Sequence, residues 1–204
     1  MRIGDFCIDK YEASQPDATK TSFGSWRFEK PVPAARSVKG VLPWHSLSWE
    51  EAAAACEKAG KRLPTLAEWQ TAFSGLTNVA WPWGNDWVDH GCYVNRSIGV
   101  YPTGGCCFES CPYPPCKEIC DMVGNVSEWI DGYWDLDCYG TDGVLIAGGA
   151  AHNGYNRRNQ QSLDPDNPGC WVFDEYAQKR EGLHFHNSTS GFSDDGFRCA
   201  LTVD

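Results

Sequence analysis

Long apolar runs, excess positive charge, repeats and linkers are all missing from this sequence. No stretch reaches the roughly 18 apolar residues that a membrane-spanning helix needs, so we expect no membrane span. The 17 Lys and Arg residues are outnumbered by 27 Asp and Glu, and the formal net charge of −10 argues against binding to nucleic acids or anionic membranes. The N-terminus, Met1–Asp5, has no apolar signal region, so we expect a soluble protein. Its location, inside a cell or displayed on a virion or cell surface, stays open. Without a repeat or a linker, residues 1–204 are expected to form one domain.

Glycine and proline are abundant, with 21 and 12 copies, and predict a loop-rich fold with short regular elements. Two capping boxes, Ser48 with Glu51 and Thr65 with Glu68, mark the starts of two short helices. The predicted elements are an edge strand over 3–12, helices over 48–59 and 65–74, strands over 126–134 and 144–147, and a last strand over 196–203. The residues predicted to face inward are Phe6 and Ile8 in the first strand, Ala52, Ala55, Cys56 and Ala59 in the first helix, and Phe197, Cys199 and Leu201 in the last strand.

Eleven cysteines are many for a reducing compartment, and the odd count leaves at least one unpaired in a monomer if all the others pair. Five of them crowd into one segment: Cys106, Cys107, Cys111, Cys116 and Cys120. Thiolates at this density suit a four-sulfur Zn²⁺ site, and they equally suit local disulfides that staple a loop. The spacing is not a standard pair of Cys-x-x-Cys knuckles, so the sequence leaves both alternatives open.

Hard oxygen donors gather in the run from Cys120 to Asp131, which we call the central motif. Asp121, Asn125 and Glu128 supply these donors within eight residues, and Gly124 permits a sharp bend between them. A hard cation such as Ca²⁺ takes carboxylate, amide and carbonyl oxygens from closely spaced positions. The alternative is a tight turn with side-chain caps that leads into a strand.

The central motif also carries a resemblance. Its segment Asp-Met-Val-Gly-Asn-Val-Ser-Glu-Trp resembles the Gly-Asn-Val-Trp-Glu-Trp signature of the formylglycine-generating-enzyme (sulfatase-modifying factor) family. Four other stretches match that family in the expected order: Ile8–Glu12, Gly60–Thr65 with Ala67–Trp69, Pro82–Asn85, and Gly196–Ala200. Together the matches run from residue 8 to residue 200.

The resemblance implies an α+β, C-type-lectin-like fold with two short helices, small twisted antiparallel sheets and long irregular loops. It places the first and last strands side by side and implies a disulfide between Cys56 and Cys199. It further implies a Ca²⁺ ion held by the side chains of Asp121 and Glu128 and by the carbonyls of Gly124 and Val126.

Catalysis in the resembling family needs a reactive cysteine pair, with copper bound by its thiolates, shortly after a Gly-Gly pair in a late strand. Here the residues after Gly148 and Gly149 contain no cysteine until Cys170. The sequence therefore argues against formylglycine-generating activity. Other enzymes of this fold place iron ligands in a partner domain, for which 204 residues leave no room. His184 and His186 would share a strand face and form at most half of a metal site; the alternative is a plain surface pair.

The remaining reading is a binding module. The chain resembles the variable proteins of diversity-generating retroelements, in which mutagenesis diversifies surface residues near the C-terminus. Residues of the favoured types fill two segments: Ala150, His152, Asn153, Tyr155, Asn156 and Arg157, followed by Phe185, His186, Asn187, Ser188, Thr189 and Phe192. Tyr, Ser, Gly and Asn are also the types that antigen-binding loops favour, whereas an ordinary solvated loop would share only the polarity. We call these twelve residues the candidate ligand surface and expect a protein or other surface ligand as partner.

Overall fold

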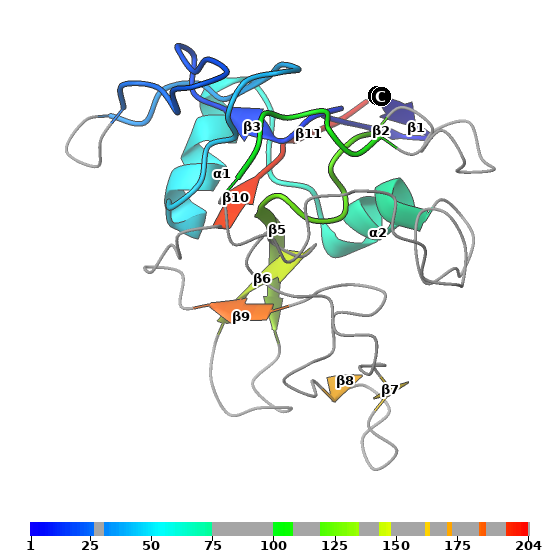
Figure 1. Ribbon diagram of the computed structural model, residues 1–204. Helices are drawn as coiled ribbons and strands as arrows, with labels where there is room; N and C mark the ends of the chain where they lie inside the picture. The colour runs from blue at the N-terminus through cyan, green and yellow to red at the C-terminus, as the bar shows by residue number, and fades with distance from the viewer. Residues whose placement is uncertain are drawn as a thin grey trace.

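The structure is a computed structural model that describes residues 1–26, 31–74, 100–107, 119–134, 143–147, 162–163, 171–172, 184–186 and 195–203. These residues form two helices and several small sheets, as the predicted α+β fold requires (Figure 1). The helices are α1 (Trp49–Lys58) and α2 (Leu66–Ser74). The strands are β1 (Arg2–Ile3), β2 (Phe6–Ile8), β3 (Ala13–Ser14), β4 (Arg36–Ser37), β5 (Ser127–Trp134), β6 (Gly143–Ala147), β7 (Ser162–Leu163), β8 (Trp171–Val172), β9 (His184–His186), β10 (Asp195–Phe197) and β11 (Ala200–Thr202).

Both helices begin at the predicted capping boxes. Ser48 Oγ accepts the amide of Glu51 at 3.3 Å, and Glu51 Oε2 accepts the amide of Ser48 at 2.8 Å. Thr65 and Glu68 make the same reciprocal pair at 3.3 and 2.8 Å. Each box satisfies two amides that the first helical turn leaves without partners. In α1 the predicted stripe is confirmed for Ala52, Ala55 and Cys56, which are buried, while Ala59 is the half-buried C-cap.

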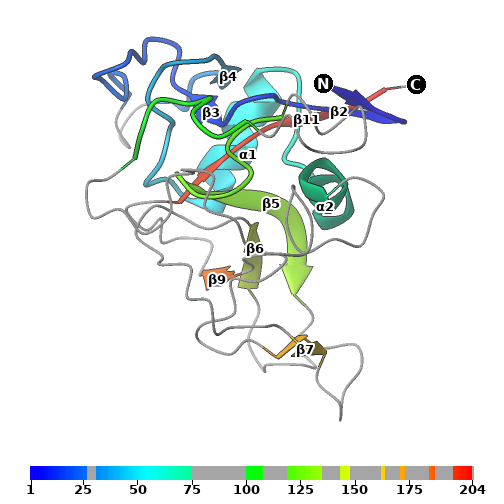
Figure 2. The same ribbon diagram turned by 45° about the vertical axis from the view of Figure 1, so that its right-hand side comes forward.

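The chain ends meet in one antiparallel sheet with the order β1-β2-β11. Ala200, Leu201 and Thr202 pair with Ile8, Cys7 and Phe6, so the two termini lie at the same end of the molecule (Figure 2). The predicted neighbourhood of first and last strands is therefore confirmed, as is the burial of Phe6 and Ile8. The prediction of an edge strand was wrong, because β1 pairs with the other side of β2 and leaves β2 at the centre.

The second sheet has the order β10-β5-β6-β9, and α1 and α2 lie on either side of β5 (Figures 1 and 2). Its β5–β6 and β6–β9 pairs are antiparallel, whereas β10 runs parallel to β5, which departs from the purely antiparallel expectation. The trace of β5 is anchored to α1 by a hydrogen bond of 2.9 Å from Trp49 Nε1 to the carbonyl of Ile130.

The predicted last strand is split between the two sheets. The chain leaves the second sheet after Phe197 and enters the terminal sheet at Ala200. This crossing breaks the alternation of a single strand, so Phe197, Arg198 and Cys199 are all fully buried and Leu201 is 41% exposed. The prediction that Leu201 faces inward was therefore wrong.

Two buried clusters form the core around the starts of β5 and β10. One contains Trp69, Ile130 and the apolar residues of β1 and β2, and the other contains Trp44, Trp129 and Phe197. The disulfide between Cys56 and Cys199, which the family resemblance implied, joins α1 to the crossing between β10 and β11. In the described part of the chain, neither helix has the length and apolar character needed to cross a membrane.

Candidate functional site

The central motif enters β5 through an irregular turn. Asp121, Gly124 and Asn125 all have positive φ, at 59°, 82° and 64°. Gly adopts this conformation freely, and Asp and Asn tolerate it better than other residues do. The turn points the side chains of Asp121, Asn125 and Glu128 into the protein, where each is at most 1% exposed.

Glu128 is held by a buried arginine from the far end of the chain. Arg198 donates from Nη2 to Glu128 Oε1 at 2.5 Å and from Nε to Glu128 Oε2 at 2.8 Å. Trp69 Nε1 donates to the same carboxylate at 2.7 Å. Arg198 also donates to the carbonyls of Cys120 and Asp9 at 2.9 and 3.1 Å. Through this one guanidinium, the start of β5, the crossing after β10, and residues 9 and 120 are connected.

Glu12 supplies a second buried carboxyl beside this pair. Its Oε2 accepts from Asn125 Nδ2 at 2.6 Å, and its Oε1 accepts from the amide of Val126 at 3.1 Å. Burial raises the pKa of Glu12 well above its ordinary value, and the nearby charges of Asp121 and Glu128 raise the pKa further. The carboxyl group thus fixes the turn of the central motif by hydrogen bonds at an electrostatic cost.

Asp121 is the third buried carboxyl of this group. It accepts from the amide of Cys106 at 2.8 Å and from the amide of Gly104. Burial raises the pKa of Asp121 above its ordinary value, although the two amides favour the ionised form. We call Glu12, Asp121, Glu128 and Arg198 the buried charge cluster. It contains three carboxyls and one guanidinium, and none is open to solvent.

The central motif matches the alternative of a tight turn with side-chain caps followed by a strand. Protein N–H groups donate to the carboxylates of both Asp121 and Glu128. The residues fit Ca²⁺ only in part. Glu128 already accepts from Arg198 and Trp69 in four contacts, which fills about four acceptor sites. Asp121 keeps acceptor capacity beside its two amides. Within the described residues, no three His, Cys, Asp or Glu side chains come together as a metal site requires. Calcium at Asp121, Gly124, Val126 and Glu128 stays a prediction.

The cysteine-rich segment uses its sulfurs for disulfides where the structure describes it. Cys107 is bonded to Cys120, and Cys106 is also disulfide-bonded. The zinc alternative fails for these three residues, because a sulfur in a disulfide is not a thiolate ligand. Cys111 and Cys116 lie outside the described residues.

Most of the candidate ligand surface also lies outside the described residues. These positions are Ala150, His152, Asn153, Tyr155, Asn156, Arg157, Asn187, Ser188, Thr189 and Phe192. The backbone of Phe185 and His186 belongs to β9, where Phe185 pairs with Leu145 and His186 with Val144. His184 is in the same strand, two positions from His186, as predicted for the histidine pair. The second segment therefore starts in β9, at one edge of the second sheet as described, and is followed in sequence by β10 at the opposite edge.

Sequence reasoning did not foresee that Arg198 and Glu12 join the central motif. A signal was present for Arg198, the one charged residue in the otherwise apolar and small stretch Gly196–Ala200, whereas Glu12 shares its stretch with Asp9 and Lys10 and nothing singled it out. A charged side chain is rarely buried without a partner of opposite charge. That rule would have paired Arg198 with one of the acidic residues of the other motifs.

The model of the sulfatase-modifying factor enzyme 1-like domain matches residues 1–203. The mouse formylglycine-generating enzyme is 35% identical over 122 residues, which cover 55% of this chain and 33% of the mouse protein. The bovine enzyme of the same name is 39% identical over 139 residues, covering 63% and 37% of the two chains. The bovine protein named inactive Cα-formylglycine-generating enzyme 2 is 36% identical over 116 residues, covering 51% and 37%. The matches thus span about a third of the length of these relatives.

Solved structures give the same fold. Treponema denticola variable protein 1 superposes with a TM-score of 0.55 at 15% sequence identity, covering 99% of this chain and 98% of that one. The crystal structure of CarF gives a TM-score of 0.53 at 18% identity, covering 98% and 87%. Because the family model matches the chain almost from end to end, this chain belongs to the sulfatase-modifying factor enzyme 1-like domain family.

Proposed function

We propose that this protein is a non-catalytic binding domain that presents the candidate ligand surface on a formylglycine-generating-enzyme-like fold. The observation that carries the proposal is the absence of a thiol between Gly149 and Cys170. A reaction that needs two cysteines there, as nucleophile and copper ligand, has neither group. Membership of the family is compatible with this, since one relative bears the name of an inactive enzyme.

The fold supports a binding role through the way it holds the second segment. That segment begins in β9 and ends at β10, and both strands are hydrogen-bonded into the second sheet. A frame of this kind permits side chains to change between its fixed ends without loss of the fold. The likeness to a solved variable protein supports the frame alone, because 15% identity carries no ligand with it.

A library that varies the candidate ligand surface tests the binding role. We expect most members to resist proteolysis like the parent, because surface changes usually alter stability by only about 0.5 kcal/mol. Members selected on an immobilised test protein should bind it. In a selected binder that keeps Tyr155, Phe185 and Phe192, replacing all three by Ser should abolish binding, since aromatic anchors dominate interfaces. A library that loses folding as readily as one randomised at twelve core positions would contradict the proposal.

The alternative is an oxidase of the formylglycine-generating type, which the identity to the mouse and bovine enzymes favours. Incubation of the protein with a sulfatase-type cysteine peptide, copper and reductant distinguishes the two. We expect the mass of the peptide to stay unchanged, with the mouse enzyme as positive control. Conversion of the peptide cysteine to an aldehyde would overturn the binding-domain proposal.

A further inference from the structure

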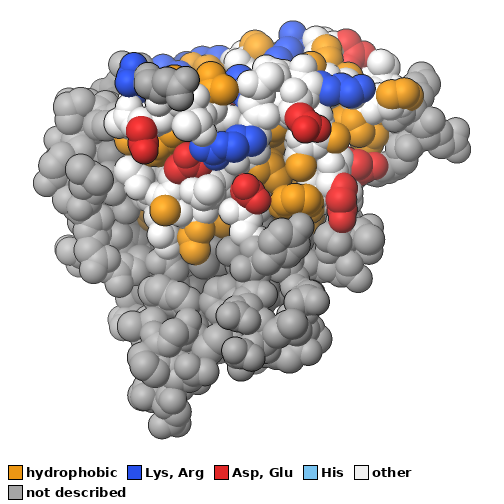
Figure 3. Space-filling view, turned by 180° about the vertical axis from the view of Figure 1, so that it is seen from behind, with side chains coloured by type: hydrophobic (Ala, Val, Ile, Leu, Met, Phe, Trp, Pro, Cys, Tyr) orange, Lys and Arg blue, Asp and Glu red, His pale blue; other side chains and the backbone are white. Residues whose placement is uncertain are grey.

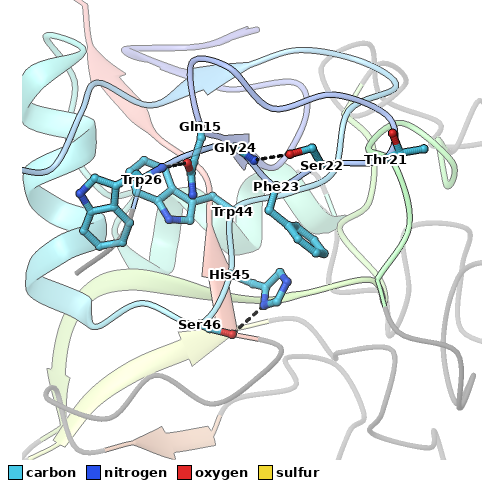
Figure 4. A pocket seen from close by; sticks show the side chains of 9 residues that line it. All are labelled: Gln15, Thr21, Ser22, Phe23, Gly24, Trp26, Trp44, His45 and Ser46. Carbon is cyan, nitrogen blue, oxygen red and sulfur yellow. Dashed lines mark hydrogen bonds between the residues drawn. The ribbon is translucent and has the colours of Figure 1, made fainter. Parts of the chain in front are cut away.

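A cavity lies between the segment of residues 15–26 and that of residues 44–46, far in sequence from the candidate ligand surface (Figure 4). We call it the Gln15 pocket. Its volume is about 370 Å³, at the lower end of the range of about 300–1,000 Å³ for small-molecule sites. The backbone around it is tied down, because the amide of Trp44 donates to Ala13 at 2.7 Å and that of Ser46 to Asp195 at 2.9 Å.

Four of the nine residues that line the pocket carry aromatic rings. The rings of Trp26 and Trp44 meet edge to face with centroids 5.1 Å apart, and both residues are buried. Phe23 and His45 form a second pair at 4.5 Å and an interplanar angle of 85°. Phe23 is 38% exposed, so its ring remains accessible to a ligand. None of the nine residues that line the cavity is Asp, Glu, Lys or Arg, which favours a neutral ligand.

The polar feature of the pocket is the side-chain amide of Gln15, a residue that is only 4% exposed. Its Oε1 accepts from the backbone amide of Trp26 at 2.8 Å, which assigns the two ends of the group, because an N–H must meet the oxygen. The NH₂ end therefore turns toward the Trp44 side of the cavity (Figure 4). Among the hydrogen bonds of the described residues, this nitrogen has no acceptor.

The loop around Gln15 is shaped to its side chain. A Cβ atom at Gly24 would come within 2.3 Å of Gln15 Oε1 and 2.6 Å of Asp17 Oδ1, and the φ of Gly24 is +106°. Only glycine lets the backbone approach the amide so closely. The amide is thus fixed in place while its donor faces the cavity, and this donor is open to water there, because Asp9 Oδ2 is the one buried side-chain atom without a partner among the described residues. A ligand oxygen at this position would replace water on a pre-positioned donor.

We propose that the Gln15 pocket binds a small, neutral, ring-containing ligand that carries a carbonyl or hydroxyl oxygen. The ring packs against Phe23, His45 and Trp44, and the oxygen accepts from Gln15 Nε2. Offset and edge-to-face ring contacts and one hydrogen bond to a pre-positioned donor supply the recognition. This site goes beyond the proposed function, since the nine described residues that line it are not part of the candidate ligand surface.

Four probes separate the ring from the acceptor: indole-3-acetamide carries both, indole lacks the carbonyl, acetamide lacks the ring, and indole-3-acetate adds a charge. Binding is measured by NMR line broadening and chemical-shift changes in the full chain. We expect indole-3-acetamide to bind with a Kd on the order of 1 mM, as the ligand efficiency of small molecules implies. Indole should bind about tenfold more weakly, because it lacks the acceptor for Gln15. Acetamide and indole-3-acetate should not bind measurably.

Two variants test the walls of the pocket. Phe23→Ser removes an exposed ring and should weaken binding of indole-3-acetamide at least about fivefold without lowering the melting temperature. The matched control is Leu201→Ser, which removes a similarly exposed apolar side chain, 41% against 38%, outside the pocket, and should leave binding unchanged. Gln15→Glu keeps an oxygen for the amide of Trp26 and removes the donor, so the preference for indole-3-acetamide over indole should disappear.

Any of three results would overturn this proposal. They are equal binding of indole-3-acetamide by the parent and Phe23→Ser, no binding of it by the parent up to about 10 mM, and binding of indole by the parent as tight as that of indole-3-acetamide. The candidate ligand surface can fail independently. Replacing Tyr155, Phe185 and Phe192 by Ser should leave binding of indole-3-acetamide unchanged, whatever it does to a protein ligand.

Discussion

Replacement of Arg198 by Met is the most informative single change in this fold. Arg198 and Glu128 are 0% and 1% exposed in their side chains, and the guanidinium meets both carboxylate oxygens at 2.5–2.9 Å. Burial lowers the pKa of Arg198, but the carboxylates of Glu128, Glu12 and Asp121 outweigh that effect and hold the pKa above its ordinary value. Methionine fills much of the same volume but leaves three buried carboxyls without a cation.

The expected loss of folding stability follows because the variant removes the cation and leaves the carboxyls buried. Removal of one partner from a buried ion pair typically costs about 3–5 kcal/mol, because the remaining charge is desolvated and unpaired. In a domain of this size each kcal/mol shifts the melting temperature by about 2–4 °C, so Arg198→Met should lower it by about 6–20 °C. Glu128→Gln added to Arg198→Met removes the unpaired charge and keeps an oxygen for Trp69 Nε1. The double variant should therefore be more stable than Arg198→Met alone.

Thermal unfolding followed by circular dichroism measures these shifts, and Arg62→Met is the matched control. Arg62 also pairs with a glutamate through two nitrogens, at 2.6 and 2.7 Å from Glu68, but its side chain is 34% exposed. Partly exposed ion pairs contribute about 0–1 kcal/mol, so the control should melt within about 4 °C of the parent. Equal shifts for Arg198→Met and Arg62→Met would refute the argument that burial makes the difference.

Three other predictions concern the disulfide, a partly buried carboxylate and calcium. Cys56→Ala with Cys199→Ala should lower the free energy of unfolding by about 2–5 kcal/mol in denaturant titrations, and an unchanged midpoint under non-reducing conditions would count against a native disulfide. Partial burial opposes ionisation of Glu68, yet its hydrogen bonds to Arg62 and the amide of Thr65 lower the pKa below the ordinary 4.5. Ionised Glu68 therefore adds stability above pH 4.5 that is lost as the pH falls through the lowered pKa. In urea denaturation, Glu68→Gln should lose less than about 1 kcal/mol of unfolding free energy relative to the parent at pH 7, and this deficit should shrink on acidification. A deficit that is the same at both pH values would contradict this. Calcium at hundredfold excess over its Kd should stabilise calcium-free protein by about 2.7 kcal/mol, and Asp121→Ala should lose that increment. If chelation gives protein that elemental analysis shows to be free of calcium, and added calcium leaves its melting temperature unchanged, the site does not exist.

The described surface seen from behind carries charges of both signs. On the face seen from behind, the described Lys and Arg side chains are mixed with Asp and Glu, as Figure 3 shows. A nucleic-acid footprint would gather positive side chains on one face. On the described part of this face the positive side chains are interspersed with negative ones and form no basic patch.

Local signals in the sequence predicted local structure well. Both helix starts followed from capping boxes, since the partners are three residues apart and the chain itself brings them together. The strands predicted over 126–134 and 144–147 lie within one residue of β5 and β6. Alternation over 3–12 correctly placed Phe6 and Ile8 inside, but the single strand predicted there is the end of β1, a turn and the three-residue β2. Near the C-terminus the same rule failed, because alternation assumes one sheet and the chain changes sheets between Phe197 and Ala200. Periodicity carries no information about a change of sheet.

Long-range pairing was the part that residue patterns did not reach. The sequence showed acidic residues in the central motif and a calcium ion was one way to satisfy them. The structure instead brings a guanidinium from 70 residues downstream onto Glu128. The apolar and small neighbours of Arg198 hint at its burial, but no local window shows which acidic residue it meets. The disulfide of Cys56 and Cys199 came from the family resemblance for the same reason, because eleven cysteines permit many pairings.

The buried charge cluster explains why the family motifs are informative about fold and silent about chemistry. Glu12, Trp69, Glu128 and Arg198 come from four separate matching stretches, and they meet in one place: Trp69 and Arg198 bind Glu128, while Glu12 caps the turn that leads to it. Each of these four motifs therefore contributes a partner to a single buried network, which satisfies polar groups that would otherwise be costly inside the protein. The fifth motif, Pro82–Asn85, lies outside the described residues. Side chains that are enclosed in this way cannot touch a substrate or a partner. What distinguishes a catalytic member from a binding member must lie outside these motifs, and the stretch after Gly149, where this chain lacks the cysteine pair, is where the two kinds of protein are expected to differ.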